Sequence, residues 1–165
     1  MSGYPKLTPA FTVRVNIDAP MPVGGQAGSS LVIVPMVGGT IKSEEGFEPK
    51  FDGELHGTGY DYIHNDASGT HMRLDVRSQV KAADSTILAM YYKGTVALTP
   101  GVKAILSGSS DAKTTEFGDS FVSFSFETGS DKFKDLENGV YVASGRFVVE
   151  KEGVVVEYRV GKVGI

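Results

Sequence analysis

Alternation of apolar and polar residues with a period of two recurs along the chain and predicts a β-sheet protein. Residues 121–128 read Phe-Val-Ser-Phe-Ser-Phe-Glu-Thr, and residues 70–77 read Thr-His-Met-Arg-Leu-Asp-Val-Arg. Successive side chains of a strand point to opposite faces, so each segment offers one apolar face to a core and one polar face to its surroundings. The 21 glycines, together with many Val, Thr, Tyr and Phe residues, favour strands joined by tight turns.

Turn signals divide the chain into short strand-like segments. Their number, about eight to ten, and their spacing predict an all-β antiparallel barrel with one or two short helical turns. Residues 107–119 are polar and linker-like, and we expect a mobile loop that acts as a lid over one mouth of the barrel. The predicted strands are residues 11–17, 31–37, 40–41, 51–55, 60–65, 70–80, 86–93, 121–128, 140–150 and 154–160; the predicted helical turns lie in 101–108 and 131–137.

Length and composition limit the class of protein. The 165 residues are expected to form a single domain, residues 1–165. The net charge of −4 and the absence of a Lys/Arg cluster argue against a nucleic-acid partner, and the lack of cysteine excludes thiolate chemistry and disulfides. The longest apolar run, residues 31–37, is too short to span a membrane, and no signal peptide is visible at the N-terminus. We therefore expect a cytoplasmic protein with no membrane partner.

One face of the strand at 70–77 carries four ionisable side chains, His71, Arg73, Asp75 and Arg77. They form a column with a spacing of about 6.6 Å, and we take them as candidate catalytic residues. Arg77 would keep Asp75 ionised as a base, His71 would carry a proton, and Arg73 would hold a carboxylate or enolate. Two structural readings compete with this one: a solvated outer face with local ion pairs, and a buried ion pair that fixes the strand register.

Residues on neighbouring strands are candidates for binding the substrate. Asp61 is expected across the hairpin from the charged column, and Tyr62, Tyr91 and Tyr92 supply aromatic rings with hydroxyl groups. Such residues suit a small hydrophobic, oxygenated ligand, for example a flat phenolic or polyketide molecule. A packing role with a polar tip is the alternative for each tyrosine.

No cofactor or metal site is predicted. The histidines at 56, 64 and 71 have spacings that match no compact ligand motif. The Gly-Gly pairs at 24–25 and 38–39 do not open a helix after a strand, so neither a phosphate loop nor a dinucleotide site is indicated.

Two predicted strands, within 31–37 and 86–92, are apolar on both faces. Such strands need cover on each side, which a packed helix or a second copy of the chain would provide. We therefore expect a homodimer.

Short segments follow one another along the chain at residues 7–15, 34–40, 59–62, 74–77, 92–94 and 126–129. Their order resembles that of the DUF3237 family, also called UPF0311. The resemblance implies a small β-barrel with a cavity, and it implies no particular reaction because most members have no assigned activity. Tyr62 stands where the family usually has Trp, and the turn at 84–86 and the segment 92–94 also depart from the family pattern.

The sequence thus leads to one catalytic hypothesis and one binding hypothesis. In the first, the chain is a cofactor-independent enzyme that uses acid–base chemistry in the barrel lumen, as a cyclase, isomerase or lyase (dehydratase) of secondary metabolism. In the second, it is a small-molecule carrier or binding protein without chemistry. The catalytic hypothesis requires the charged column at 71–77 to face an enclosed interior.

Overall fold

The computed structural model describes residues 2–165, which form one antiparallel sheet of ten strands and two short helices. The prediction of an all-β antiparallel fold with short helices is confirmed. In chain order, the elements are β1 (Lys6–Ile17), β2 (Met21–Gly24), β3 (Ser30–Ser43), β4 (Gly53–Leu55), β5 (Gly59–Asn65), β6 (His71–Ala82), β7 (Ile87–Ala97), α1 (Pro100–Leu106), β8 (Ser120–Glu127), α2 (Lys134–Glu137), β9 (Tyr141–Glu150) and β10 (Gly153–Gly164).

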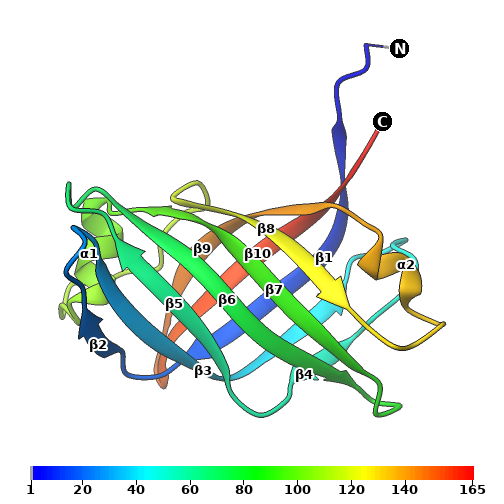
Figure 1. Ribbon diagram of the computed structural model, residues 1–165, viewed down its shortest axis with the longest axis horizontal. Helices are drawn as coiled ribbons and strands as arrows, with labels where there is room; N and C mark the ends of the chain where they lie inside the picture. Colours follow the sequence, from blue (N-terminus) through cyan, green and yellow to red (C-terminus); the bar gives the residue numbers. More distant parts are fainter. Residues whose placement is uncertain (1) are drawn as a thin grey trace.

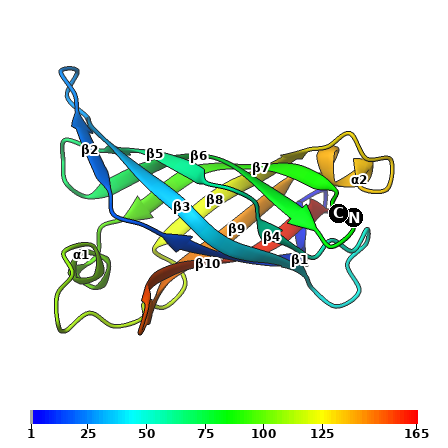
Figure 2. The same ribbon diagram turned by 90° about the horizontal axis from the view of Figure 1, so that it is seen from below.

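Strand β1 closes the sheet into a barrel, because it pairs with β10 on one edge and with β3 on the other. Short strands β4 and β5 share one place between β3 and β6, and β2 pairs only with the first part of β3. Figures 1 and 2 show the resulting flattened barrel, with α1 at one end and α2 at the other. A barrel of about eight strand positions has an interior that side chains fill or that holds one small ligand.

Packed aromatic rings fill the interior at the α2 end of the barrel. Phe11 lies edge-on to Phe47 and Phe126, with ring centroids 4.9 Å and 5.6 Å apart. Phe51 meets Phe133, just before α2, at 5.0 Å. These rings are almost completely buried, so this end of the barrel is a solid core.

Helix α1 covers the opposite end. The Thr99 side chain accepts a hydrogen bond from the Val102 N–H at its start, and Pro100 occupies the first turn. Val102 and Ile105 are buried, whereas Leu106 is half exposed at the opening. No helix formed by residues 2–165 is long and apolar enough to cross a membrane.

The segment 107–119 is fastened to the side of the barrel rather than lying over its mouth. The Thr115 N–H donates to the Phe147 carbonyl at 2.9 Å, and the Phe147 N–H donates to Thr115 Oγ1 at 3.0 Å. The Val149 N–H donates to Thr114 Oγ1 at 3.0 Å, next along β9. These bonds give hydrogen-bond partners to backbone groups in the part of β9 that extends beyond β8. The mouth of the barrel is therefore covered by α1 and not by this segment.

Adjacent residues on β7 give a direct test of which face is the core. Leu88 is fully buried and Ile87 is half exposed. We expect Leu88→Ala to lower the free energy of unfolding by about 2–5 kcal/mol because it leaves a cavity. Ile87→Ala should change it by less than about 0.5 kcal/mol. Urea denaturation of the two variants measures the difference, and equal losses would contradict the assigned faces.

Candidate functional site

An enclosed cavity of about 60 Å³ lies in the barrel interior on the α1 side, where Leu106 forms part of its wall. Its lining is apolar except for three side chains, Asp61, Tyr92 and Tyr158, which come from β5, β7 and β10. The apolar wall consists of Val15, Ile17, Val34, Met36, Ile63, Met72, Leu74, Val96, Leu106, Phe147 and Val156. The only carboxyl group of this chamber is that of Asp61.

The alternation of β5 directs Asp61 inward. Asp61 and Ile63 are buried, and Tyr60, Tyr62 and His64 between and beside them face outward. Asp61 is only 8% exposed, and its Oδ1 accepts a hydrogen bond from the Asp75 N–H at 3.1 Å. This bond lies where the β5–β6 pairing is interrupted at Tyr62 and Ile63, so the Asp61 side chain satisfies a strand N–H that lacks its usual partner.

Burial raises the pKa of Asp61 to about 7, because the charged carboxylate loses its hydration in the apolar chamber. The bond from the Asp75 N–H acts in the opposite direction and lowers the pKa by less, while the charge of the Asp75 side chain adds a smaller increase. Near neutral pH both the acid and the carboxylate are therefore populated. Asp61 can both accept and donate a proton at this pH.

Two phenols lie in the same chamber. Tyr92 and Tyr158 are completely buried, their rings meet at 5.1 Å and 60°, and burial is the main cause that raises the pKa of both hydroxyls. Tyr92 also stacks on Phe124 with centroids 4.5 Å apart, which fixes its ring. Both phenols are therefore proton-bearing hydrogen-bond donors at neutral pH.

The hydroxyl of Tyr92 has a weak partner within the chain. The Tyr92 hydroxyl donates to Met36 Sδ at 3.4 Å, and a thioether is a poor acceptor. The Tyr158 ring lies over Gly145, where a Cβ would come within 2.6 Å of Cε1 and within 3.2 Å of the Ser120 Cβ. The Ser120 Oγ, also buried, has no hydrogen-bond partner among residues 2–165. A ligand oxygen would be a better acceptor for the Tyr92 hydroxyl than the Met36 sulfur is.

The charged column of β6 faces outward, so the expectation that it lines the interior is wrong. His71, Arg73 and Arg77 are exposed and Asp75 is partly exposed, whereas Met72, Leu74 and Val76 point into the core. The reason is energetic. Burial of the apolar face stabilises the fold, whereas desolvation of each buried charge would cost on the order of several kcal/mol.

On the outside, the column makes local ion pairs. Arg73 holds Asp66 through two hydrogen bonds of 2.8 Å, and Asp75 pairs with Lys93 at 3.1 Å. The Arg77 guanidinium lies 5.1 Å from the centre of the Tyr91 ring. This arrangement corresponds to the reading of the column as a solvated face.

The candidate binding residues divide between the two faces. Asp61 and Tyr92 lie in the chamber, whereas Tyr62 is 43% exposed and Tyr91 donates its hydroxyl to Glu127 at 2.8 Å on the outside. The expectation that Tyr62 and Tyr91 line the same interior as Tyr92 is wrong. Tyr158 joins the site although the sequence did not single it out, because the run Val154–Val156 before it hides the alternation.

The chamber carries acid–base groups and hydrogen-bond donors, but no cation. Neither Lys, Arg nor His is among the residues that line it. Within residues 2–165, no three His, Asp or Glu side chains gather closely enough to hold a metal ion. The arrangement can move a proton and bind an oxygen atom of a neutral molecule.

The chain is thus a closed antiparallel β-barrel protein with one carboxyl group in an apolar chamber. The family described as "Protein of unknown function (DUF3237)" matches residues 5–163, and the chain belongs to this family. The resemblance of the short segments in the sequence is thereby confirmed. Comparison with curated proteins gives no match.

Solved structures share the fold over their whole length. A conserved protein of unknown function from Rhodopseudomonas palustris has a TM-score of 0.79 at 17% identity, with 99% of this chain and 100% of that chain covered. A β-barrel-like protein from Acinetobacter baumannii has a TM-score of 0.75 at 20% identity and 99% coverage of both chains. An enzyme from Penicillium herquei has a TM-score of 0.62 at 17% identity, with 97% and 95% covered. At these identities the similarity establishes the fold alone.

The raised pKa of Asp61 predicts an unusual pH dependence of stability. The folded chain keeps this proton up to about pH 7, whereas a free Asp releases it near 3.8. Between these values the folded state binds more protons than the unfolded state, so the free energy of unfolding falls as pH rises. The loss is on the order of 4 kcal/mol at most.

Asp61→Asn should remove this decline, because Asn keeps an oxygen for the Asp75 N–H and does not titrate. Urea denaturation between pH 4 and 8 measures it, with Asp131→Asn, an exposed loop position, as the matched control. A pH profile that is the same in the wild type and in Asp61→Asn would contradict the assignment.

Proposed function

We propose that the chain is a cofactor-independent enzyme that carries out acid–base chemistry on a small, neutral, largely apolar molecule with a carbonyl or phenolic oxygen. Asp61 exchanges a proton with the ligand, and the hydroxyls of Tyr92 and Tyr158 bind its oxygen. Cyclisation, isomerisation and dehydration are the reaction types that these groups serve.

The enclosed position of Asp61 supports this proposal most directly. A carboxyl group in an apolar interior costs stability, and its one strong contact, the Asp75 N–H at 3.1 Å, would be met equally well by an uncharged Asn. Burial brings its pKa to about 7, where a general acid–base group is most effective. A purely structural role explains the contact with Asp75 but does not require an ionisable group.

The proton transfer can be written with these groups alone. The Asp61 carboxylate takes a proton from the carbon beside the carbonyl, and the C–H electron pair moves into the carbon–carbon bond to form an enolate. The enolate oxygen accepts hydrogen bonds from Tyr92 and Tyr158, which stabilise the charge in a dry site. Protonated Asp61 then returns the proton to another carbon in an isomerisation, or to a leaving hydroxyl that departs as water.

The size of the chamber indicates how a ligand reaches it. A volume of 60 Å³ corresponds to only about two water molecules, so a larger molecule requires the wall to move. Leu106 of α1 is both a lining residue and half exposed, and it separates the chamber from solvent by one side chain. Outward movement of the short helix α1 would open this end, whereas the aromatic core at the α2 end stays closed.

A binding protein without chemistry is the second candidate. The almost wholly apolar lining favours it, because such a wall holds a hydrophobic ligand whether or not Asp61 reacts. The two candidates differ in the consequence of neutralising Asp61. A carrier would keep its affinity, and an enzyme would lose its turnover.

Exchange of carbon-bound hydrogen tests the catalytic proposal. In D₂O, we expect the wild-type protein to accelerate deuterium incorporation beside the carbonyl of cyclohexanone or 2-tetralone, followed by NMR. Asp61→Asn should reduce the rate at least about 100-fold, the usual contribution of a general base, while Asp131→Asn should leave it unchanged. Binding of the ketones without any exchange by the wild type would favour the carrier instead.

The lack of a cationic side chain in the lining of the chamber predicts selectivity for neutral ligands. We expect methyl 4-oxocyclohexanecarboxylate to bind at least about 100-fold more tightly than 4-oxocyclohexanecarboxylate, since no cation offsets the desolvation of a carboxylate. The two molecules share the ring and the ketone. Titration calorimetry at pH 7 measures both, and equal affinities would show that the ligand binds elsewhere.

A further inference from the structure

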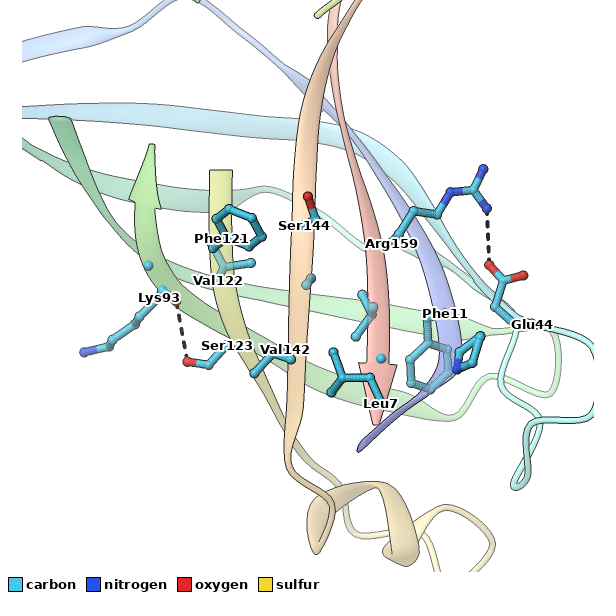
Figure 3. A pocket seen from close by; sticks show the side chains of 15 residues that line it. Leu7, Phe11, Glu44, Lys93, Phe121, Val122, Ser123, Val142, Ser144 and Arg159 are labelled. Atoms are coloured by element: carbon cyan, nitrogen blue, oxygen red, sulfur yellow. Dashed lines mark hydrogen bonds and ion pairs between the residues drawn. The ribbon is translucent and has the colours of Figure 1, made fainter. Parts of the chain in front are cut away.

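A second cavity, a groove of about 720 Å³, lies on the outer surface of the barrel (Figure 3). It runs over β1, β8, β9 and β10, and its lining includes Leu7, Phe121, Val142 and Gly161. Phe121 and Leu7 are each 59% exposed. Large apolar side chains gathered in one groove are typical of a surface that is covered by a partner.

One wall of this groove is an arm that projects from the barrel (Figure 1). The arm consists of residues 6–9 of β1 paired with residues 161–164 of β10, and it leaves the barrel at a bulge between Pro9 and Phe11. Pairing of β1 with β3 begins only at Phe11, so the outer edge of the arm has no neighbouring strand among residues 2–165. On the inner side of the arm, residues 161–162 still pair with β9, so only its tip is two-stranded. A two-stranded ribbon is only marginally stable by itself, and packing from outside would stabilise this tip.

Apolar side chains at the arm and beside it are also exposed. Tyr4 and Ile165, which flank the two strands, are 78% and 74% exposed. Val140, 62% exposed, lies against the arm because its carbonyl accepts the Val163 N–H at 2.8 Å. Exposed apolar side chains thus occur both on the arm, which protrudes, and in the groove, which is recessed.

The charges at the rim indicate which partner fits. Lys93 lies at one end of the groove and Glu44 with Arg159 at the other (Figure 3). Lys93 pairs with Asp75 at 3.1 Å and Arg159 with Glu44 at 3.4 Å. Each end of the rim therefore carries one cation and one anion, and this balance disfavours a nucleic acid or an anionic membrane as the partner. A twofold axis across the groove would place the Lys93–Asp75 pair of one copy beside the Glu44–Arg159 pair of the other, so that no charge lacks an opposite charge nearby.

We propose that a second copy of the chain covers this groove in a twofold-symmetric dimer, with the arm of each protomer lying in the groove of its partner. Leu7 of one protomer packs beside the partner's Phe121, and the reciprocal contact follows from the symmetry. A surface with both a protruding and a recessed apolar part is complementary to itself in this way. The inference does not depend on the proposed function, because the groove lies outside the barrel.

Analytical ultracentrifugation tests the dimer. We expect the wild type to be dimeric, and Leu7→Asp and Phe121→Asp each to raise the dimer dissociation constant at least about 30-fold, as for a central interface residue. Tyr62→Asp, at an exposed aromatic on the β5 face outside the groove, is the matched control and should leave the constant unchanged. A monomeric wild type, or a dimer that resists both groove substitutions, would overturn the proposal.

Cysteine cross-linking tests the placement of the arm, and the chain has no native cysteine to interfere. After Leu7→Cys and Phe121→Cys proteins are mixed under oxidising conditions, we expect a disulfide between the two chains, because the bond needs Cα atoms within about 7 Å. A mixture of Leu7→Cys and Tyr62→Cys should give none. Absence of the first product, or equal yields of both, would show that the arm does not occupy the partner's groove.

Discussion

The double pairing of β1 is the interaction on which the rest of the structure depends. Its residues Phe11–Asn16 bond to β10 on one side and to β3 on the other, and this closes the sheet into a ring. Closure gives the sheet an inside that is separate from the outside, and it removes the unpaired edges of the barrel. Without it, Asp61 would lie on one face of an open sheet in water, and neither its raised pKa nor an enclosed chamber would exist.

Closure also explains why the two ends of the barrel differ. At the α2 end, rings such as Phe11, Phe126 and Phe133 fill the interior and contribute stability. At the α1 end, a helix of seven residues and the single side chain of Leu106 cover a small void. In the proposed function, a ligand enters at the α1 end, so the site would open without disturbing the aromatic core at the α2 end.

The inner and outer faces of the same strands support separate roles. Inside β6 and β7, Leu74 and Tyr92 form the wall of the chamber, and outside them Asp75 and Lys93 form a solvated ion pair at the rim of the groove. A strand changes face at every residue. Substitutions on the inner face of β6 and β7 should therefore affect the chamber, and the proposed dimer concerns only those outer-face positions that line the groove.

The sequence by itself determined the strand pattern and the faces of β5, β6 and β8, because alternation such as that of residues 121–127 depends only on local periodicity. It did not reveal β2, whose Pro22 is a residue that strands seldom contain, nor the last residues of β7. The side of the sheet that became the interior was decided by the tertiary structure, since burying one apolar face of β6 forces its four ionisable side chains into solvent. Only closure brings Asp61, Tyr92 and Tyr158 together, because they lie on three strands far apart in the chain and meet solely across the enclosed interior.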